Sequence, residues 1–266
     1  MGDTMKLCSI RSGSQGNAIL VYTEETKILI DCGVSGKTAE NGMREMGVEP
    51  GSLSAVLVTH EHMDHVSGVG VMTRRYKIPV YANRKTWTAM EKSVGKIAPE
   101  NRREFEHSEN FSVGDILVQP FSIPHDAADP VGYSLISGNK KVSVATDIGV
   151  LEESLFRSIQ GSQGVLLESN HDRNMLDMGG YPLPLKQRIR GDKGHLSNDD
   201  AGKAAEFLVR MGTRKILLGH LSHENNYPLL AEQTVTNILR DAGIEPGKDM
   251  QLCVAPRDEI SPIFEM

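Results

Sequence analysis

The chain has 266 residues, of which 39% are hydrophobic and 24% are charged, and these proportions are typical of a folded protein. Its net charge of −6 excludes an overall basic surface for nucleic acid, while a local basic rim stays compatible with it. No stretch has the roughly 20 apolar residues of a membrane-spanning helix, and Met1–Ile10 lacks the apolar core of a secretory signal. Because the three cysteines are also widely spaced, we expect a cytoplasmic protein without disulfides.

Short apolar segments alternate with helical patterns along the chain, which predicts a single α/β domain over residues 1–266. The strands expected are, in chain order, Ala18–Tyr22, Lys27–Ile30, Ala55–Val58, Val80–Ala82, Ile116–Phe121, Val142–Ala145, Val165–Leu167 and Lys215–Leu218. Three of the expected helices are Asp64–Tyr76, Arg84–Lys96 and Leu151–Ile159. Two more begin after the capping residue Ser197 and near Pro228, and end before Gly212 and Gly243.

Polar residues follow four of the predicted strands at the point where each strand ends. These residues are Asp31, His60, Asp147 and His220. Ligands gather at the carboxyl ends of strands in α/β folds, so we expect residues distant in sequence to meet at one edge.

The densest group of potential metal ligands is the HxHxDH motif, which places His60, His62, Asp64 and His65 directly after a strand. Imidazole and carboxylate groups suit Zn²⁺, Mn²⁺ and Fe²⁺, so the ligand types leave the metal open. A further candidate, His125, follows another predicted strand.

The order Asp, HxHxDH, His, Asp, His resembles that of the metallo-β-lactamase superfamily. The resemblance implies a four-layer αββα sandwich with a dinuclear metal site at one edge, holding two divalent ions, Zn²⁺ or Mn²⁺, with Fe²⁺ also compatible. By position, the implied ligands are His60, His62 and His125 for the first ion, Asp64, His65 and His220 for the second, and Asp147 between them. Asp31 then supports the histidine motif by hydrogen bonding.

Segments 12–17, 168–172, 185–197 and 221–226 are similar to those of the bacterial WalJ/YycJ group, whose members are regarded as DNA exonucleases. This likeness implies a metal-dependent phosphodiesterase in which a hydroxide held between two ions attacks a backbone phosphate of DNA. In that mechanism Asp64 orients the nucleophile. His195 stabilises the phosphate or protonates the leaving oxygen.

Cations and histidines near the motif are the candidate substrate contacts. The cations are Lys186, Arg188, Arg190 and Lys193, which suit a phosphate backbone but are also compatible with a solvated basic loop. His195 precedes a helix N-terminus, where a phosphate is favoured. His171 and His223 are either substrate contacts or structural residues.

Two other functions stay compatible with these residues. A hydrolase of small esters, lactones or cyclic phosphates would use the same metal site within a closed pocket. A metal-stabilised module that binds DNA without cleaving it is disfavoured, because structural sites close their shell with four ligands around one ion.

Overall fold

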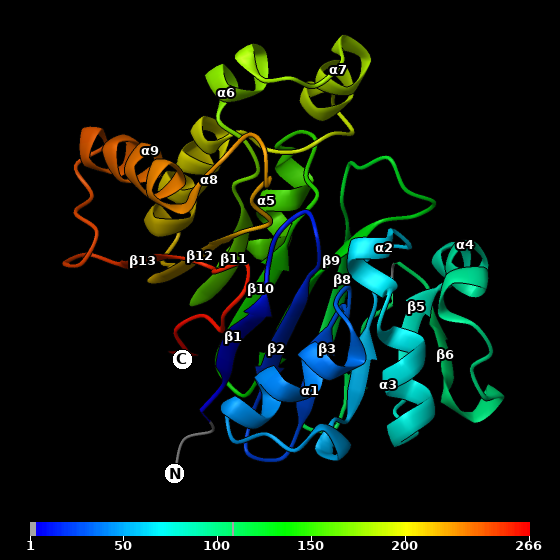
Figure 1. Cartoon of the computed structure of the whole chain (residues 1–266). Helices are drawn as coiled ribbons and strands as arrows, with labels where there is room; N and C mark the ends of the chain where they lie inside the picture. Colours follow the sequence, from blue (N-terminus) through cyan, green and yellow to red (C-terminus); the bar gives the residue numbers. More distant parts are fainter. Residues whose placement is uncertain (1–3, 108) are drawn as a thin grey trace.

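The computed structural model describes residues 4–107 and 109–266, which form two seven-stranded sheets packed face to face (Figure 1). The first sheet has the order β14-β1-β2-β3-β4-β5-β6. Its strands are β1 (Lys6–Arg11), β2 (Ala18–Tyr22), β3 (Lys27–Ile30), β4 (Ala55–Leu57), β5 (Val80–Asn83), β6 (Arg102–Phe105) and β14 (Phe264–Glu265).

The second sheet has the order β13-β12-β11-β10-β9-β8-β7. Its strands are β7 (Phe111–Val113), β8 (Ile116–Ser122), β9 (Val131–Ser137), β10 (Lys140–Ala145), β11 (Gly164–Glu168), β12 (Lys215–Gly219) and β13 (Gln251–Val254). In this sheet β10 to β13 run parallel, so the carboxyl ends of β10, β11 and β12 lie at one edge.

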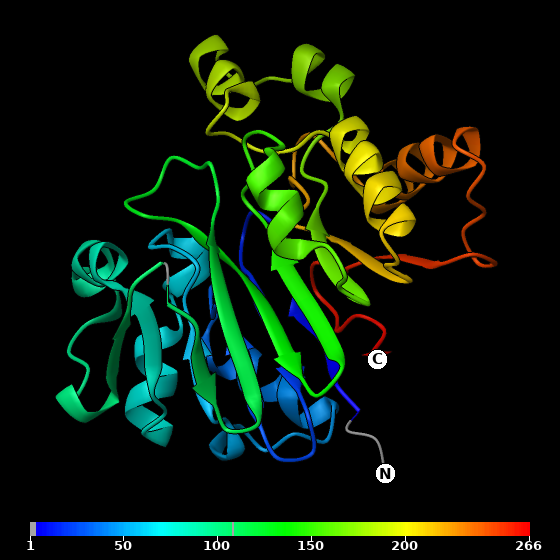
Figure 2. The same cartoon turned by 180° about the vertical axis from the view of Figure 1, so that it is seen from behind.

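Helices cover the outer face of each sheet, which makes four layers. Over the first sheet lie α1 (Gly36–Glu45), α2 (Met63–Val66), α3 (Val69–Tyr76) and α4 (Arg84–Val94), and over the second lie α5 (Glu153–Ile159), α8 (Asn198–Arg210) and α9 (Pro228–Asp241) (Figures 1 and 2). Two short 3₁₀ turns, Pro50–Ser52 and Pro99–Asn101, lie in connections. The predicted αββα sandwich is confirmed.

The apolar runs in the strands reflect burial on both faces. In β2, Ile19 and Val21 belong to the core between the sheets, whereas Ala18 and Leu20 pack in the core beneath the helices. A strand with two buried faces needs apolar residues at every position, which is why β2 was predictable from its sequence.

The predicted helix Asp64–Tyr76 is wrong as a single element, since it divides into α2 and α3. The break falls at Gly68, whose N–H donates to the Cys32 carbonyl at 2.7 Å. A Cβ at Gly68 would lie 2.2 Å from the Val34 carbonyl oxygen, so only glycine allows this close approach. The break turns Asp64 and His65 inward while α3 packs on the sheet.

Sequence reasoning also missed several elements. The unpredicted strands are β1, β6, β7, β9, β13 and β14, and the unpredicted helices are α1, α6 (Arg173–Met178) and α7 (Leu183–Arg190). The last two stand together at the end of the molecule beyond the second sheet (Figures 1 and 2).

Candidate metal centre

The predicted metal ligands come together at one edge of the two sheets. They come from the loop after β4 (His60, His62), from α2 (Asp64, His65) and from the segments after β8 (His125), β10 (Asp147) and β12 (His220). Their donor atoms form overlapping groups, each small enough to surround one cation.

Asp147 lies at the middle of these groups. Its Oδ2 is 3.3 Å from His65 Nε2, and its Oδ1 is 3.3 Å from His220 Nε2 and 3.7 Å from His125 Nε2. Asp64 Oδ2 completes one side, at 3.5 Å from His65 Nε2 and 3.9 Å from His220 Nε2. One carboxylate therefore faces imidazoles from three separate parts of the chain.

On the other side of Asp147, His60, His62 and His125 make a second group with donor atoms within 4.8 Å of one another. His60 Nε2 and His62 Nδ1 are 3.1 Å apart. The other ring nitrogen of His125 lies 3.0 Å from the Gly194 carbonyl oxygen, which directs its Nε2 toward the cluster.

Three of the site residues have a left-handed backbone. The φ angles are +58° at Asp31, +62° at Asp147 and +55° at His220, each just after a strand. A positive φ costs free energy for a residue with a Cβ and is concentrated at functional sites. Here it turns each side chain sharply from the strand end into the shared cluster.

Asp31 holds the histidine motif in place from beneath. Its side chain is 1% exposed and accepts hydrogen bonds from the Thr59 N–H and hydroxyl, both at 2.8 Å. His65 Nδ1 lies 2.7 Å from Asp31 Oδ2, so the opposite nitrogen of that ring faces Asp64 and Asp147. This is the supporting contact that the sequence predicted for Asp31.

Two buried donor atoms of the cluster lack partners, which is what a cation site requires. Within residues 4–107 and 109–266, His125 Nε2 and Asp147 Oδ2 are inaccessible to solvent and make no hydrogen bond. Burial alone would raise the pKa of Asp147, but the imidazoles of His220, His65 and His60 hold that pKa well below its usual value. A buried carboxylate kept in its charged form among imidazoles fits a divalent cation.

Glu168, at the end of β11, is a site residue that sequence reasoning missed. Its side chain is fully buried, and Oε2 accepts the N–H groups of Ile148 (2.6 Å) and Leu196 (3.2 Å). Oε1 lies 2.8 Å from His195 Nδ1, which fixes the orientation of that ring. Burial opposes the charged form of His195, yet the charge of Glu168 and its hydrogen bond raise the pKa of His195 to about 9.

His195 stands between the cluster and a neighbouring hollow. Its ring is stacked on that of His220 at 5.4 Å, and its side chain is 19% exposed. The hollow, of about 300 Å³, is also lined by His171, Arg173 and Arg190. His171 is buried, its Nδ1 has no partner within the described residues, and burial lowers its pKa to about 4.

The predicted basic segment forms a helix, α7, up to Arg190, and Lys193 lies in the turn that follows; the three cations on the helix have partners. Arg188 pairs with Asp126, beside His125, and Arg190 pairs with Asp177. Lys186 donates to the backbone carbonyl of Asp177 at 2.7 Å. These contacts tie α7 to neighbouring segments while leaving both arginines about half exposed.

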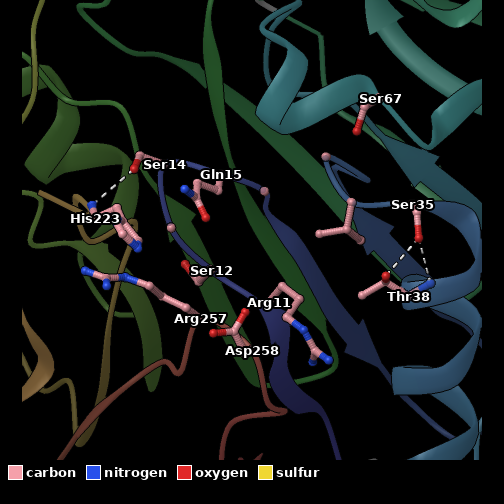
Figure 3. A pocket seen from close by; sticks show the side chains of 14 residues that line it. Arg11, Ser12, Ser14, Gln15, Ser35, Thr38, Ser67, His223, Arg257 and Asp258 are labelled. Atoms are coloured by element: carbon pink, nitrogen blue, oxygen red, sulfur yellow. Dashed lines mark hydrogen bonds between the residues drawn. The ribbon is translucent and has the colours of Figure 1, made fainter.

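His223 lies apart from His171 and His195. It lines a second hollow, of about 420 Å³, together with Arg11 and Arg257 (Figure 3). Its Nδ1 is 3.1 Å from Glu224 Oε1, and its side chain is about half exposed.

The model of the β-lactamase superfamily domain matches residues 26–221. Together with the two-sheet fold and the His/Asp cluster, this match places the chain in the metallo-β-lactamase fold superfamily, as a metal-dependent hydrolase that binds divalent metal.

Within this superfamily the chain is similar to two curated proteins along almost its whole length. It is 40% identical over 243 residues to exodeoxyribonuclease YycJ of Bacillus anthracis, covering 91% of this chain and 92% of the relative. It is 39% identical to exodeoxyribonuclease WalJ of Streptococcus pneumoniae serotype 2, covering 98% of each. These likenesses confirm the predicted resemblance to the WalJ/YycJ group.

A solved structure of the same fold is that of YhfI from Bacillus subtilis, a metallo-β-lactamase fold protein. It matches with a TM-score of 0.74 at 16% identity, covering 99% of this chain and all of the other. None of the helices in the described part of the chain is both long and apolar enough to cross a membrane.

Proposed function

We propose that this chain is a DNA exonuclease that uses two divalent ions, Zn²⁺ or Mn²⁺, to hydrolyse backbone phosphodiesters. The observation that carries the proposal is its similarity to two exodeoxyribonucleases along nearly the full length of each. The two donor groups on either side of Asp147 support the number of ions.

In this proposal His60, His62 and His125 would hold one ion, Asp64, His65 and His220 would hold the other, and Asp147, between the two groups, would serve both. When bound, such ions lower the pKa of a water molecule and offset the charge on phosphate oxygens. The remaining steps belong to residues of the chain.

Asp64 is the more accessible carboxylate of the cluster, with 25% of its side chain exposed against 3% for Asp147. It can therefore orient the attacking water and accept its proton. His195 Nδ1 lies 3.7 Å from Asp147 Oδ1, whereas His65 is near Oδ2 of the same carboxylate, and Glu168 fixes the His195 ring. We assign to His195 the hydrogen bond to the scissile phosphate or to the leaving oxygen.

The substrate contacts in this proposal include His171, which shares a hollow with His195, and Lys186, Arg188 and Arg190 on α7. Both arginines are about half exposed, so a phosphate could replace Asp126 as the partner of Arg188, or Asp177 as the partner of Arg190. His223 belongs to the separate hollow near Arg257.

The test is cleavage of 5′-labelled and 3′-labelled DNA by metal-stripped protein restored with Mn²⁺ or Zn²⁺. We expect metal-dependent release of short products by the wild type and none by Asp64→Asn, and the label released first gives the polarity. Glu91→Gln, an exposed change on α4, serves as the matched control. Turnover of bis-p-nitrophenyl phosphate without cleavage of DNA would instead indicate a hydrolase of small phosphodiesters.

A further inference from the structure

The hollow beside His223 is lined by two arginines that form no ion pair within the described part of the chain. Arg11, at the end of β1, and Arg257, after β13, both line it (Figure 3). Within the described residues, neither forms an ion pair: Arg11 donates to the Ile10 carbonyl, and Arg257 donates to backbone carbonyls including that of Asn226 at 3.0 Å. This contrasts with α7, where both arginines are paired with carboxylates.

The rest of the lining also favours an anion. Hydroxyl groups of Ser14 and Ser35 border the hollow, and Ser35 caps the N-terminus of α1, whose first turn has no acidic residue. The helix dipole adds partial positive charge at this end. Asp258 is the single carboxylate in the lining, so the two guanidinium groups outnumber it.

One terminal nitrogen of Arg257 is available to a ligand: within the described residues its Nη2 donates to backbone carbonyls, whereas its Nη1 makes no hydrogen bond and is not closed to solvent. Its Nε–H is inaccessible to solvent and has no hydrogen-bond partner within the described residues. The Nη1 group, rather than this closed Nε–H, is therefore the donor of Arg257 that an anion in the hollow could meet. The volume of about 420 Å³ lies in the range of ligand pockets, and the lining has no aromatic ring other than His223 on which a base could stack.

One loop separates this hollow from the metal centre. Residues 12–16 line the hollow, while Ser12 Oγ accepts the N–H of His220 at 2.8 Å. The adjacent Asn17 has its Nδ2 3.3 Å from His65 Nε2 and its N–H bonded to the Asp64 carbonyl at 2.8 Å. A strand whose scissile phosphate lies at the cluster could therefore pass over this loop into the hollow.

We propose that the hollow formed by Arg11 and Arg257 binds a phosphate of the nucleic-acid strand at a distance from the scissile bond. This inference rests on the proposed nuclease function and adds to it a second phosphate site, in which Arg11 and Arg257, on either side of Asp258 (Figure 3), supply positive charge and charge-assisted hydrogen-bond donors to the strand. Because such contacts read no base, the site positions the strand without regard to sequence. The phosphate is either an internal diester or a terminal monoester.

The test measures binding of a fluorescent single-stranded oligonucleotide to full-length protein in EDTA, where the strand stays intact, at several salt concentrations. We expect Arg11→Gln and Arg257→Gln each to weaken binding about ten-fold, equally for different sequences, and to reduce the salt slope by about 0.7. Arg103→Gln, an exposed change on β6, is the charge-matched control and should bind like the wild type. In the presence of metal, the KM for DNA should rise by a similar factor in the first two variants only.

Asp258→Asn separates a phosphate site from a merely structural role. Loss of a carboxylate from the lining should tighten oligonucleotide binding if the hollow takes a phosphate, whereas damage to the fold would weaken it. Arg257 also holds backbone carbonyls, so thermal melting of its variant is compared with that of Arg11→Gln, because the Arg11 side chain donates, among the described residues, to the neighbouring Ile10 carbonyl alone.

The two possible phosphates are distinguished with oligonucleotides that end in a hydroxyl or in a 5′- or 3′-phosphate. A loss confined to one phosphorylated end assigns the hollow to a terminal phosphate, and an equal loss on all three assigns it to an internal one. Normal binding and KM in Arg11→Gln and Arg257→Gln, with DNA cleavage intact, would overturn the phosphate site alone. A wild type that neither binds nor cleaves DNA would overturn the proposed function and this site together.

Discussion

Replacing Glu168 by glutamine changes the charge beside His195 with little change in shape. Oε2 of Glu168 accepts both backbone N–H groups, from Ile148 and Leu196, whereas Oε1 faces only His195. The carbonyl oxygen of glutamine can keep both backbone bonds, and its NH₂ group then faces His195 Nδ1. That nitrogen must become an acceptor, so the proton moves to Nε2 and the ring loses its charged partner.

The magnitude follows from the lost contact. A hydrogen bond to a charged group contributes about 1.5–3 kcal/mol, which corresponds to a decrease of about 10- to 150-fold in kcat/KM if the contact acts in the transition state. The unfolding free energy should change by only about 1 kcal/mol, because the two buried N–H groups stay bonded. Glu168→Ala removes those acceptors too and should cost several kcal/mol of stability.

The assay is DNA cleavage at saturating metal, with thermal melting and metal content measured on the same samples. Glu91→Gln, at an exposed position on α4, controls for the change in net charge. A Glu168→Gln protein that keeps kcat/KM within about three-fold of the wild type, with normal metal content, would refute the role of Glu168 in orienting His195.

Three further changes test other parts of the structure. The pKa of His171 is lowered to about 4, so the folded state excludes its proton and stability is lost as the pH falls from about 6.5 toward 4. Chemical denaturation at several pH values should show a loss of up to about 3 kcal/mol in the unfolding free energy of the wild type over this range. The unfolding free energy of His171→Leu should depend less steeply on pH, and equal dependence in both proteins would contradict the lowered pKa of His171. Tyr133→Phe removes the buried donor to the Val58 carbonyl at 2.6 Å and should lower the unfolding free energy by about 1–3 kcal/mol, and an unchanged denaturation midpoint would count against that bond. Gly33→Ala would place a Cβ 1.6 Å from the Asp64 carbonyl oxygen, so we expect reduced metal content and a lower melting temperature, while wild-type values for both would show that the backbone yields without cost.

The predicted ligands were readable from sequence because each follows a recognisable strand. A run of buried apolar residues followed by Asp or His marks the carboxyl end of a strand, and parallel strands bring such ends to one edge. The left-handed backbone at Asp147 and His220 then completes the turn into the cluster. The HxHxDH motif needed no tertiary information, since it places four candidate ligands in one short segment.

Some strands were missed because they contain buried polar residues whose hydrogen-bond partners lie on other elements, as Ser134 of β9 bonds to Ser143 and to the Ser158 carbonyl of α5. In β9, Ser134 is buried and its hydroxyl lies 2.6 Å from that of Ser143 in β10. Taken alone, Gly132 and Ser134 lower the hydrophobicity of the segment, although Val131, Tyr133 and Leu135 keep the two-residue period of a strand. Glu168 was missed for a related reason, since nothing local shows that a glutamate at a strand end is buried until Ile148 and Leu196 supply N–H groups to it.

Clustering of cations in a sequence does not show which guanidinium groups have carboxylate partners in the fold. Arg188 and Arg190 are conspicuous in the sequence because they are close neighbours. In the fold, however, Arg188 pairs with Asp126 and Arg190 pairs with Asp177. Arg11 is an isolated cation in the sequence and ends β1. The C-terminal segment after Arg257 returns to β1, because β14 pairs with that strand. The topology therefore brings Arg11 and Arg257 to one hollow. The loop of residues 12–16, which also lines that hollow, contacts the metal centre through Ser12 and His220.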